Sequence, residues 1–278
     1  MSVKLFTMVK DEVDIIEYWI MYHGKLFGYE NLFIVDNMST DGTFEKINSY
    51  KNRGIHIFRE QDYKKKGEIM TNLIKSMGSY DIAFPIDIDE FIVYYDETKN
   101  VIDPCYSVEY LNNLIKTDLF KQNSVLKANY IASLIHEDNG YGFKDAMIES
   151  KYGEYYDYKH FAKTFFNKNN WTGTVDHGNH YSVKDYIKSD LCLIHYHNRN
   201  NDQIKKKTEN NVLGFGYKLD VNYLKTLGNC NGKHHVQRMI HILENPDCLV
   251  VPIHSTRNEK DISLQPMIDC VKDFNIEL

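Results

Sequence analysis

The sequence contains no unbroken apolar segment close to the roughly 18 residues that a membrane span requires. The amino-terminal stretch MSVKLFTMVKDE lacks the apolar core of a secretory signal peptide, so we expect a cytoplasmic protein, in the host cytoplasm if its source is viral. The five cysteines are widely spaced and none forms a C-x-x-C pair, which indicates neither a disulfide framework nor a zinc knuckle. A net charge of −6 argues against general binding to nucleic acid.

Both common glycine-rich phosphate-binding motifs are also missing. The first predicted strand is not followed by G-x-G-x-x-G, and G-x-x-x-x-G-K-[ST] occurs nowhere. This excludes the usual dinucleotide-binding dehydrogenases and P-loop enzymes. A bound diphosphate would therefore have to be neutralised chiefly by a metal ion and by cationic side chains.

The first part of the chain alternates between strand and helix patterns. With 42% hydrophobic residues, a chain of 278 residues can bury a large core. Apolar runs and helical spacings predict the order β-α-β-α-β-α-β, which is typical of a doubly wound, mostly parallel α/β sheet with flanking helices. The predicted strands are VKLFTMV, LFIVD (32–36), IHIFRE and the run 80–86, with helices over roughly 16–27, up to Tyr50, and 67–77.

The segment FPIDIDEF follows the fourth predicted strand and places Asp87, Asp89 and Glu90 among apolar residues. If the strand continues through it, Asp87 and Asp89 point to the same face and both can approach one ion. Carboxylate oxygens favour Mg²⁺ or Mn²⁺ over Zn²⁺. We therefore predict a metal site. The alternative is that these aspartates only close a strand as turn or capping residues.

Three loops should meet at the carboxyl ends of the parallel strands, where open α/β sheets bind ligands. Asp36 could accept hydrogen bonds from a base or a ribose. Ser39 fits either ligand contact or simple helix capping. From these loops we assign Lys10, Glu12, Asp36, Asn37, Ser39 and Asp87 to nucleotide binding. Asp89 is assigned to the metal, together with Asp87.

The stretch VKDEVDIIEYWIMYHGKLFGYENLFIVDNMSTDGT, followed some forty residues later by DIDEF, resembles the nucleotide-sugar domain of GT-A glycosyltransferases, in the family-two-like branch. This resemblance implies a GT-A fold and a nucleotide-sugar donor, with a UDP-sugar favoured. It implies that Asp36 lies at the nucleotide base and that Asp87 and Asp89 are the DxD motif. It also implies that Asp89 binds Mn²⁺ or Mg²⁺ bridging the donor diphosphate.

The resemblance also extends to two histidine segments in the later half. A G-N-H segment and an L-x-H-Y segment before a basic helix match His180 and His195, and we assign His195 as the third protein ligand of the metal. For His177 and His197 we favour packing or hydrogen-bonding roles.

An acceptor hydroxyl must displace the nucleoside diphosphate, and an inverting enzyme needs a base for its proton. Our candidates for the base are Glu137, Asp138 and His180, with Asp176 also considered; only the resemblance favours inversion. To the donor site we also assign Val9, Lys66, Ile88 and Lys163, in addition to the loop residues above.

We predict a glycosyltransferase domain over residues 1–200, with a nucleotide-sugar half (1–100) and an acceptor and metal-completing half (101–200), followed by a helical C-terminal subdomain (201–278). The expected activity is metal-dependent transfer of a sugar, hexosyl or related, to a hydroxyl of a glycan or other acceptor. Two alternatives remain: a metal-dependent nucleotidyltransferase or phosphohydrolase, and a binding module without turnover.

Overall fold

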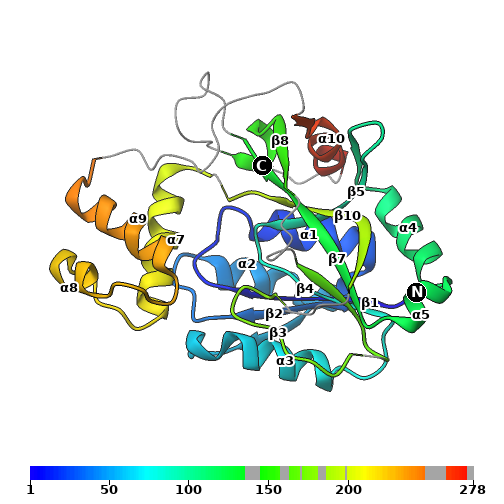
Figure 1. The fold of residues 1–278 in the computed structure, drawn as a ribbon, viewed down its shortest axis with the longest axis horizontal. Coiled ribbons are helices and arrows are strands. Elements are labelled where there is room, and N and C mark those ends of the chain that lie inside the picture. The colour runs from blue at the N-terminus through cyan, green and yellow to red at the C-terminus, as the bar shows by residue number, and fades with distance from the viewer. Residues whose placement is uncertain are drawn as a thin grey trace.

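The computed structural model describes residues 1–134, 145–156, 163–169, 171–180, 186–197, 199–247 and 261–273. Within these ranges the strands form a single sheet with helices on both faces (Figure 1). The strands are β1 (Val3–Val9), β2 (Leu32–Asp36), β3 (His56–Arg59), β4 (Ile82–Pro85), β5 (Glu90–Asp96), β6 (Val101–Asp103), β7 (Val125–Ser133), β8 (Tyr152–Tyr156), β9 (Thr164–Asn167), β10 (Ile187–His195) and β11 (Ile262–Ser263). The helices are α1 (Ile16–Phe27), α2 (Thr43–Ser49), α3 (Lys66–Ser76), α4 (Tyr106–Leu114), α5 (Asp118–Gln122), α6 (Ala146–Glu149), α7 (Asn201–Gly214), α8 (Val221–Thr226), α9 (Lys233–Glu244) and α10 (Gln265–Asp273), with short 3₁₀ turns η1 (Tyr29–Asn31), η2 (Lys51–Arg53) and η3 (Tyr63–Lys65).

The sheet has a parallel half and a mixed half. Its main strand order is β3-β2-β1-β4-β9-β7-β10-β5-β6, and β8 pairs with β7 and β11 outside this path. Strands β1 to β4 are mutually parallel, as the alternating sequence pattern predicts. Beyond β4 only β7 and β10 run parallel, and the other pairings are antiparallel. The predicted α/β fold with flanking helices is confirmed.

Strand β1 shows why this sheet needs nearly continuous apolar strands. Successive side chains point to opposite faces. Leu5 and Val9 pack into the core on the side of α1, whereas Phe6 and Met8 pack into the core on the side of α3. A strand buried on both faces has no place for regular polar alternation.

Helices α7 to α9 lie together beside the main sheet (Figure 1). They enclose a smaller core of their own, made by Ile204, Val212, Leu224, Val236, Met239 and Ile242. Within the described residues after 200, these three segments are helical, while the predicted boundaries of a C-terminal subdomain stay a prediction. Strand β11 and helix α10 do not belong to this smaller core. Strand β11 pairs with β8, and Met267 of α10 packs in the main core. Among the described residues, no helix has the length and apolar character needed to cross a membrane.

Candidate active site

The segment 86–89 is a turn between β4 and β5, not a continuation of β4. The amide of Glu90 donates to the carbonyl of Asp87 (3.1 Å), and the amide of Asp87 donates to Glu90 Oε2 (2.8 Å). The expectation that Asp87 and Asp89 share one face of a strand is therefore wrong. The turn sends the two carboxylates to different neighbours.

Asp87 is held by three side chains that come from distant parts of the sequence. Lys66 Nζ and Asn179 Nδ2 each lie 2.8 Å from Asp87 Oδ1, and Lys163 Nζ lies 2.8 Å from Oδ2. Lys66 and Lys163 are both buried. Burial raises the pKa of Asp87, but Lys163 and Lys66 outweigh burial and lower that pKa below its ordinary value. Asp87 is therefore an ionised hub that neutralises two buried lysines.

Glu90 belongs to the same network. Its Oε1 accepts a hydrogen bond from the Tyr130 hydroxyl (3.1 Å) and lies 3.4 Å from Lys163 Nζ. Burial raises the pKa of Glu90, against the opposing effect of Lys163. This acid fixes the turn and the position of Lys163.

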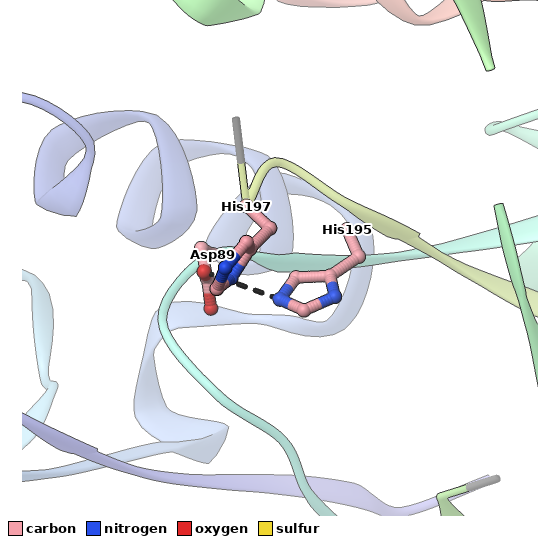
Figure 2. Close-up of side chains that lie close together, drawn as sticks. All are labelled: Asp89, His195 and His197. Carbon is pink, nitrogen blue, oxygen red and sulfur yellow. Dashed lines mark ion pairs between the residues drawn. The ribbon is translucent and has the colours of Figure 1, made fainter. Parts of the chain in front are cut away.

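Asp89 lies with two histidines at the end of β10 (Figure 2). His195 Nε2 is 3.3 Å from Asp89 Oδ2, and the amide of Tyr196 donates to the Asp89 carbonyl (2.9 Å). Potential ligand atoms of Asp89, His195 and His197 all lie within 4.8 Å of one another. Asp89 is buried, and its Oδ1 has no hydrogen-bond partner in the part of the chain that the structure describes. These three residues form an acid–imidazole cluster.

His197 is the member of this cluster that the sequence analysis did not select. It accepts a hydrogen bond from Arg238 Nη1 (3.2 Å), as the favoured hydrogen-bonding role predicts, but it also faces the cavity beside Asp89. Its position two residues after His195 could have indicated in the sequence that both imidazoles belong to one cluster. Asp87, which was predicted as a ligand, is not in the cluster.

A second group of charges supports Asp89 from the side of α7. Lys207 Nζ makes an ion pair with Asp89 Oδ2 and lies 3.8 Å from Glu12 Oε1. Arg199 is buried and pairs with Glu12, and its Nη1 lies 2.8 Å from Asp14. Burial raises the pKa of Glu12 in spite of these cations. Arg199 had no recognisable signal in the sequence.

The loop after β2 is largely occupied with its own hydrogen bonds. Asp36 is fully buried; its Oδ1 accepts from the amide of Ser39 (3.1 Å) and its Oδ2 from Arg59 Nε (3.1 Å). The Ser39 hydroxyl accepts from the amide of Asp11 (3.0 Å). Lys10 Nζ donates to the carbonyls of Asn37 (3.1 Å) and Met38 (3.0 Å).

A cavity of about 400 Å³ is lined by the surroundings of Asp87, by the acid–imidazole cluster and by Lys207. Val9, Asp36 and Ser39 are not among the described residues that line it. Glu137 and Asp138 lie outside the described residues. The predicted site residues that do line the cavity are Lys10, Glu12, Asn37, Lys66, Asp87, Ile88, Asp89, Lys163, His180 and His195.

His180 faces this cavity with a carboxylate beside it. Asp176 Oδ1 lies 3.4 Å from His180 Nδ1 and also accepts the backbone amides of His180 (2.7 Å) and Gly178 (2.8 Å). Burial raises the pKa of Asp176, but its hydrogen bonds to His180 outweigh burial and lower it. The result is an oriented acid–imidazole pair.

No protein-family model matches the chain, and no curated protein matches it. Part of the chain is similar to solved structures. A structure of glucosyl-3-phosphoglycerate synthase from Mycobacterium tuberculosis with Mg²⁺ and UDP is 17% identical, over 50% of this chain and 45% of that one, with a TM-score of 0.32. A structure of the same enzyme with Mn²⁺, UDP-glucose and phosphoglyceric acid is 19% identical, over 46% and 43%, with a TM-score of 0.33. A structure described only as that of a mycobacterial protein is 18% identical, over 47% of this chain and 41% of that one, also with a TM-score of 0.33. The match therefore spans less than half the length of each of these structures.

Proposed function

We propose that the protein is a metal-dependent glycosyltransferase that transfers a sugar from a nucleotide-sugar donor, with a UDP-sugar favoured, to a hydroxyl of a glycan or another acceptor. The observation that carries this proposal is the composition of the cavity of about 400 Å³ around Asp89. It combines the acid–imidazole cluster with the lysines Lys10, Lys66, Lys163 and Lys207. It lies at the carboxyl ends of the parallel strands, where such sheets bind nucleotides.

The residues of the acid–imidazole cluster fit a divalent cation. Asp89 offers a buried oxygen that has no partner among the described residues, and His195 and His197 offer imidazole nitrogens beside it. Mg²⁺ prefers oxygen ligands, whereas Mn²⁺ is better suited to a site with imidazole ligands. When bound, Mn²⁺ would stabilise the negative charge on the departing diphosphate as a Lewis acid.

Lysines complete the charge balance for a diphosphate in the absence of a glycine-rich loop. Lys10 hydrogen-bonds to carbonyl groups, and its ammonium is 4.0 Å from the nearest carboxylate oxygen of Asp11. Within the described residues its charge is therefore only weakly compensated, and we assign Lys10 to the donor phosphates. Lys66 and Lys163 each form an ion pair with Asp87. We assign them the role of fixing the position of Asp87 in the cavity wall.

We assign the role of base to His180, with inversion at the anomeric carbon. Asp176 lies beside Nδ1 and orients the ring, and the other nitrogen, Nε2, would accept the proton of the acceptor hydroxyl. His180 lines the cavity, which supports this assignment.

The direct test is a screen of UDP-, GDP-, CMP- and dTDP-sugars with and without Mn²⁺, by thermal shift and by product analysis. A ligand that binds the native state raises the melting temperature by mass action. We expect a shift that requires Mn²⁺, and slow hydrolysis of the same donor to nucleoside diphosphate and sugar. Pyrophosphate release from a nucleoside triphosphate and a sugar phosphate would instead identify a nucleotidyltransferase. Metal-independent binding of every donor would overturn the proposal.

The role of His180 is tested by His180→Gln, assayed by donor hydrolysis, in which water replaces the acceptor hydroxyl. Loss of a general base costs about 10²- to 10⁴-fold in turnover. We expect that loss in kcat with unchanged donor affinity. The matched control is His241→Gln, at an exposed position on α9. Unchanged turnover in His180→Gln would move the role to another residue, with Glu137 and Asp138 next to be substituted.

A further inference from the structure

A second wall of the same cavity is aromatic. Tyr63, His177 and Phe215 all line it, and they come from η3, from the segment after β9 and from the end of α7. The ring centroids of Tyr63 and Phe215 are 6.0 Å apart, and His177 lies 5.8 Å from each. We call these three residues the aromatic wall. Its chemistry differs from that of the acid–imidazole cluster, since it consists of aromatic rings and contains no carboxylate.

The rings of the aromatic wall are held in place by close backbone packing. The Tyr63 hydroxyl donates to Asn211 Oδ1 (3.1 Å). A Cβ atom at Gly214 would lie 2.5 Å from the Tyr63 ring, and one at Gly232 would lie 2.6 Å from the Phe215 ring, so only glycine permits this approach. The wall is therefore preformed, which lowers the ordering cost of binding a ligand.

His177 is positioned by α3. The hydroxyl of Thr71 accepts the amide of Val175 (3.0 Å), and a Cβ at Gly67 would lie 2.6 Å from the Val175 carbonyl. These contacts fix the chain two residues before His177 against the start of the helix.

Asp36, by contrast, is poorly placed to bind a nucleobase. It is fully buried, both carboxylate oxygens already accept hydrogen bonds, and it is not among the cavity-lining residues of the described chain. The base position implied by the family resemblance would require Asp36 to exchange its bonds with Ser39 and Arg59.

The sheet order gives the aromatic wall a suitable location. Tyr63 follows β3, and β3 is separated from β4 by β2 and β1. Three strand spacings amount to about 14 Å between the ends of β3 and β4. A nucleotide with its phosphates beside Asp89 can span the cavity in this direction.

We infer that the aromatic wall binds the nucleobase of the donor by stacking. This inference rests on the proposed function, because it needs a nucleotide donor. It places base recognition on residues of the later half of the chain as well as on the loop after β3.

The experiment compares UDP with inorganic pyrophosphate, each with Mn²⁺, by calorimetry on the wild type and on Phe215→Leu. Pyrophosphate keeps the phosphates and lacks the base. Removing one base–aromatic stack costs about 1–3 kcal/mol, which is about 5- to 150-fold in affinity. We expect a loss in that range for UDP and unchanged affinity for pyrophosphate. The matched control is Phe58→Leu, at an exposed aromatic outside the cavity.

Saturation-transfer NMR on bound UDP gives a second measurement. We expect saturation to be strongest at the base protons in the wild type and to fall selectively there in Phe215→Leu. Equal UDP affinity in both proteins, or an equal loss for UDP and pyrophosphate, would overturn the inference and leave the proposed function standing. If wild type with Mn²⁺ binds none of UDP, GDP, CDP and ADP, the inference and the proposed function both fail.

Discussion

Asp87 and Asp89 are two residues apart in one turn, and their surroundings are opposite in kind. Asp87 has two lysines and an amide on its carboxylate, at 2.8 Å each. Asp89 has an imidazole at 3.3 Å, the Lys207 ammonium, and one oxygen with no partner among the described residues. The first carboxylate is saturated with donors, whereas the second can still take a ligand.

This difference shows that the spacing of two acids does not assign them the same role. The DxD pattern suggested a pair of ligands for one ion. In the structure the turn separates them, so that Asp87 organises the lysines and Asp89 faces the histidines. Substitution of Asp89 should therefore weaken metal binding, whereas substitution of Asp87 should lower the stability of the fold.

The largest effect is expected from Asp89→Asn on metal binding. Loss of even an outer-shell partner typically costs 10- to 100-fold in metal affinity, and loss of the only carboxylate in the cluster should cost about 100-fold or more. Equilibrium dialysis with Mn²⁺, or electron paramagnetic resonance of the free ion, measures this directly. Asp190→Asn, at an exposed position on β10, is the control. Unchanged Mn²⁺ affinity in Asp89→Asn would rule out the acid–imidazole cluster as the metal site.

Asp87→Asn should act on stability. It removes the counter-charge of Lys66 and Lys163, whose side chains are only 6% and 1% exposed. Breaking a buried ion pair by removing one partner costs about 3–5 kcal/mol. Because Lys163 keeps its contact with Glu90, we expect the free energy of unfolding to fall by about 3 kcal/mol. Urea unfolding measures the change.

The control for this substitution is Asp118→Asn, an exposed aspartate paired with Lys121 on α5, which should change stability by less than about 0.5 kcal/mol. If Asp87→Asn also retains Mn²⁺ binding, Asp87 acts on stability alone and Asp89 on metal binding. A stable Asp87→Asn protein that has lost Mn²⁺ would instead return Asp87 to the metal.

The parallel half of the fold was predictable because its strands and helices have strong local patterns. The apolar run of β1 and the helical spacing that ends at Gly28 specify their elements from nearby residues alone. The strands of the later half, most of which pair antiparallel, lack such a repeating unit. Their pairing depends on contacts between distant segments, such as β7 with β9 and β10, which spacing does not encode.

For the candidate site, sequence patterns selected Asp89 and His195, which the structure brings together, but not the partners that surround each acid. Lys66 and Lys163 were assigned to the donor, and the structure places both on Asp87. Asn179, adjacent to the chosen His180, is the third partner. Such pairings arise when the turn and the segment around residue 179 meet in space, and neither segment specifies the other.

The smallest expected effect comes from Lys207→Met, and it should be a gain. The Lys207 ammonium lies on Asp89 Oδ2, where it competes with a divalent cation for the same carboxylate, and Glu12 Oε1 is an alternative partner at 3.8 Å. Its removal should therefore raise Mn²⁺ affinity by roughly three- to tenfold, since like charges at such distances repel by about 1 kcal/mol or more. Lys206→Met, one residue earlier at an exposed position of α7, should leave Mn²⁺ affinity unchanged. Lys207→Met should also bind UDP less tightly when Mn²⁺ is saturating. In the wild type, the ammonium that the metal displaces from Asp89 can bind the diphosphate, and the variant lacks this ammonium. A fall in Mn²⁺ affinity would mean that Lys207 supports the cluster, and the contrast drawn between a saturated Asp87 and an available Asp89 would not hold.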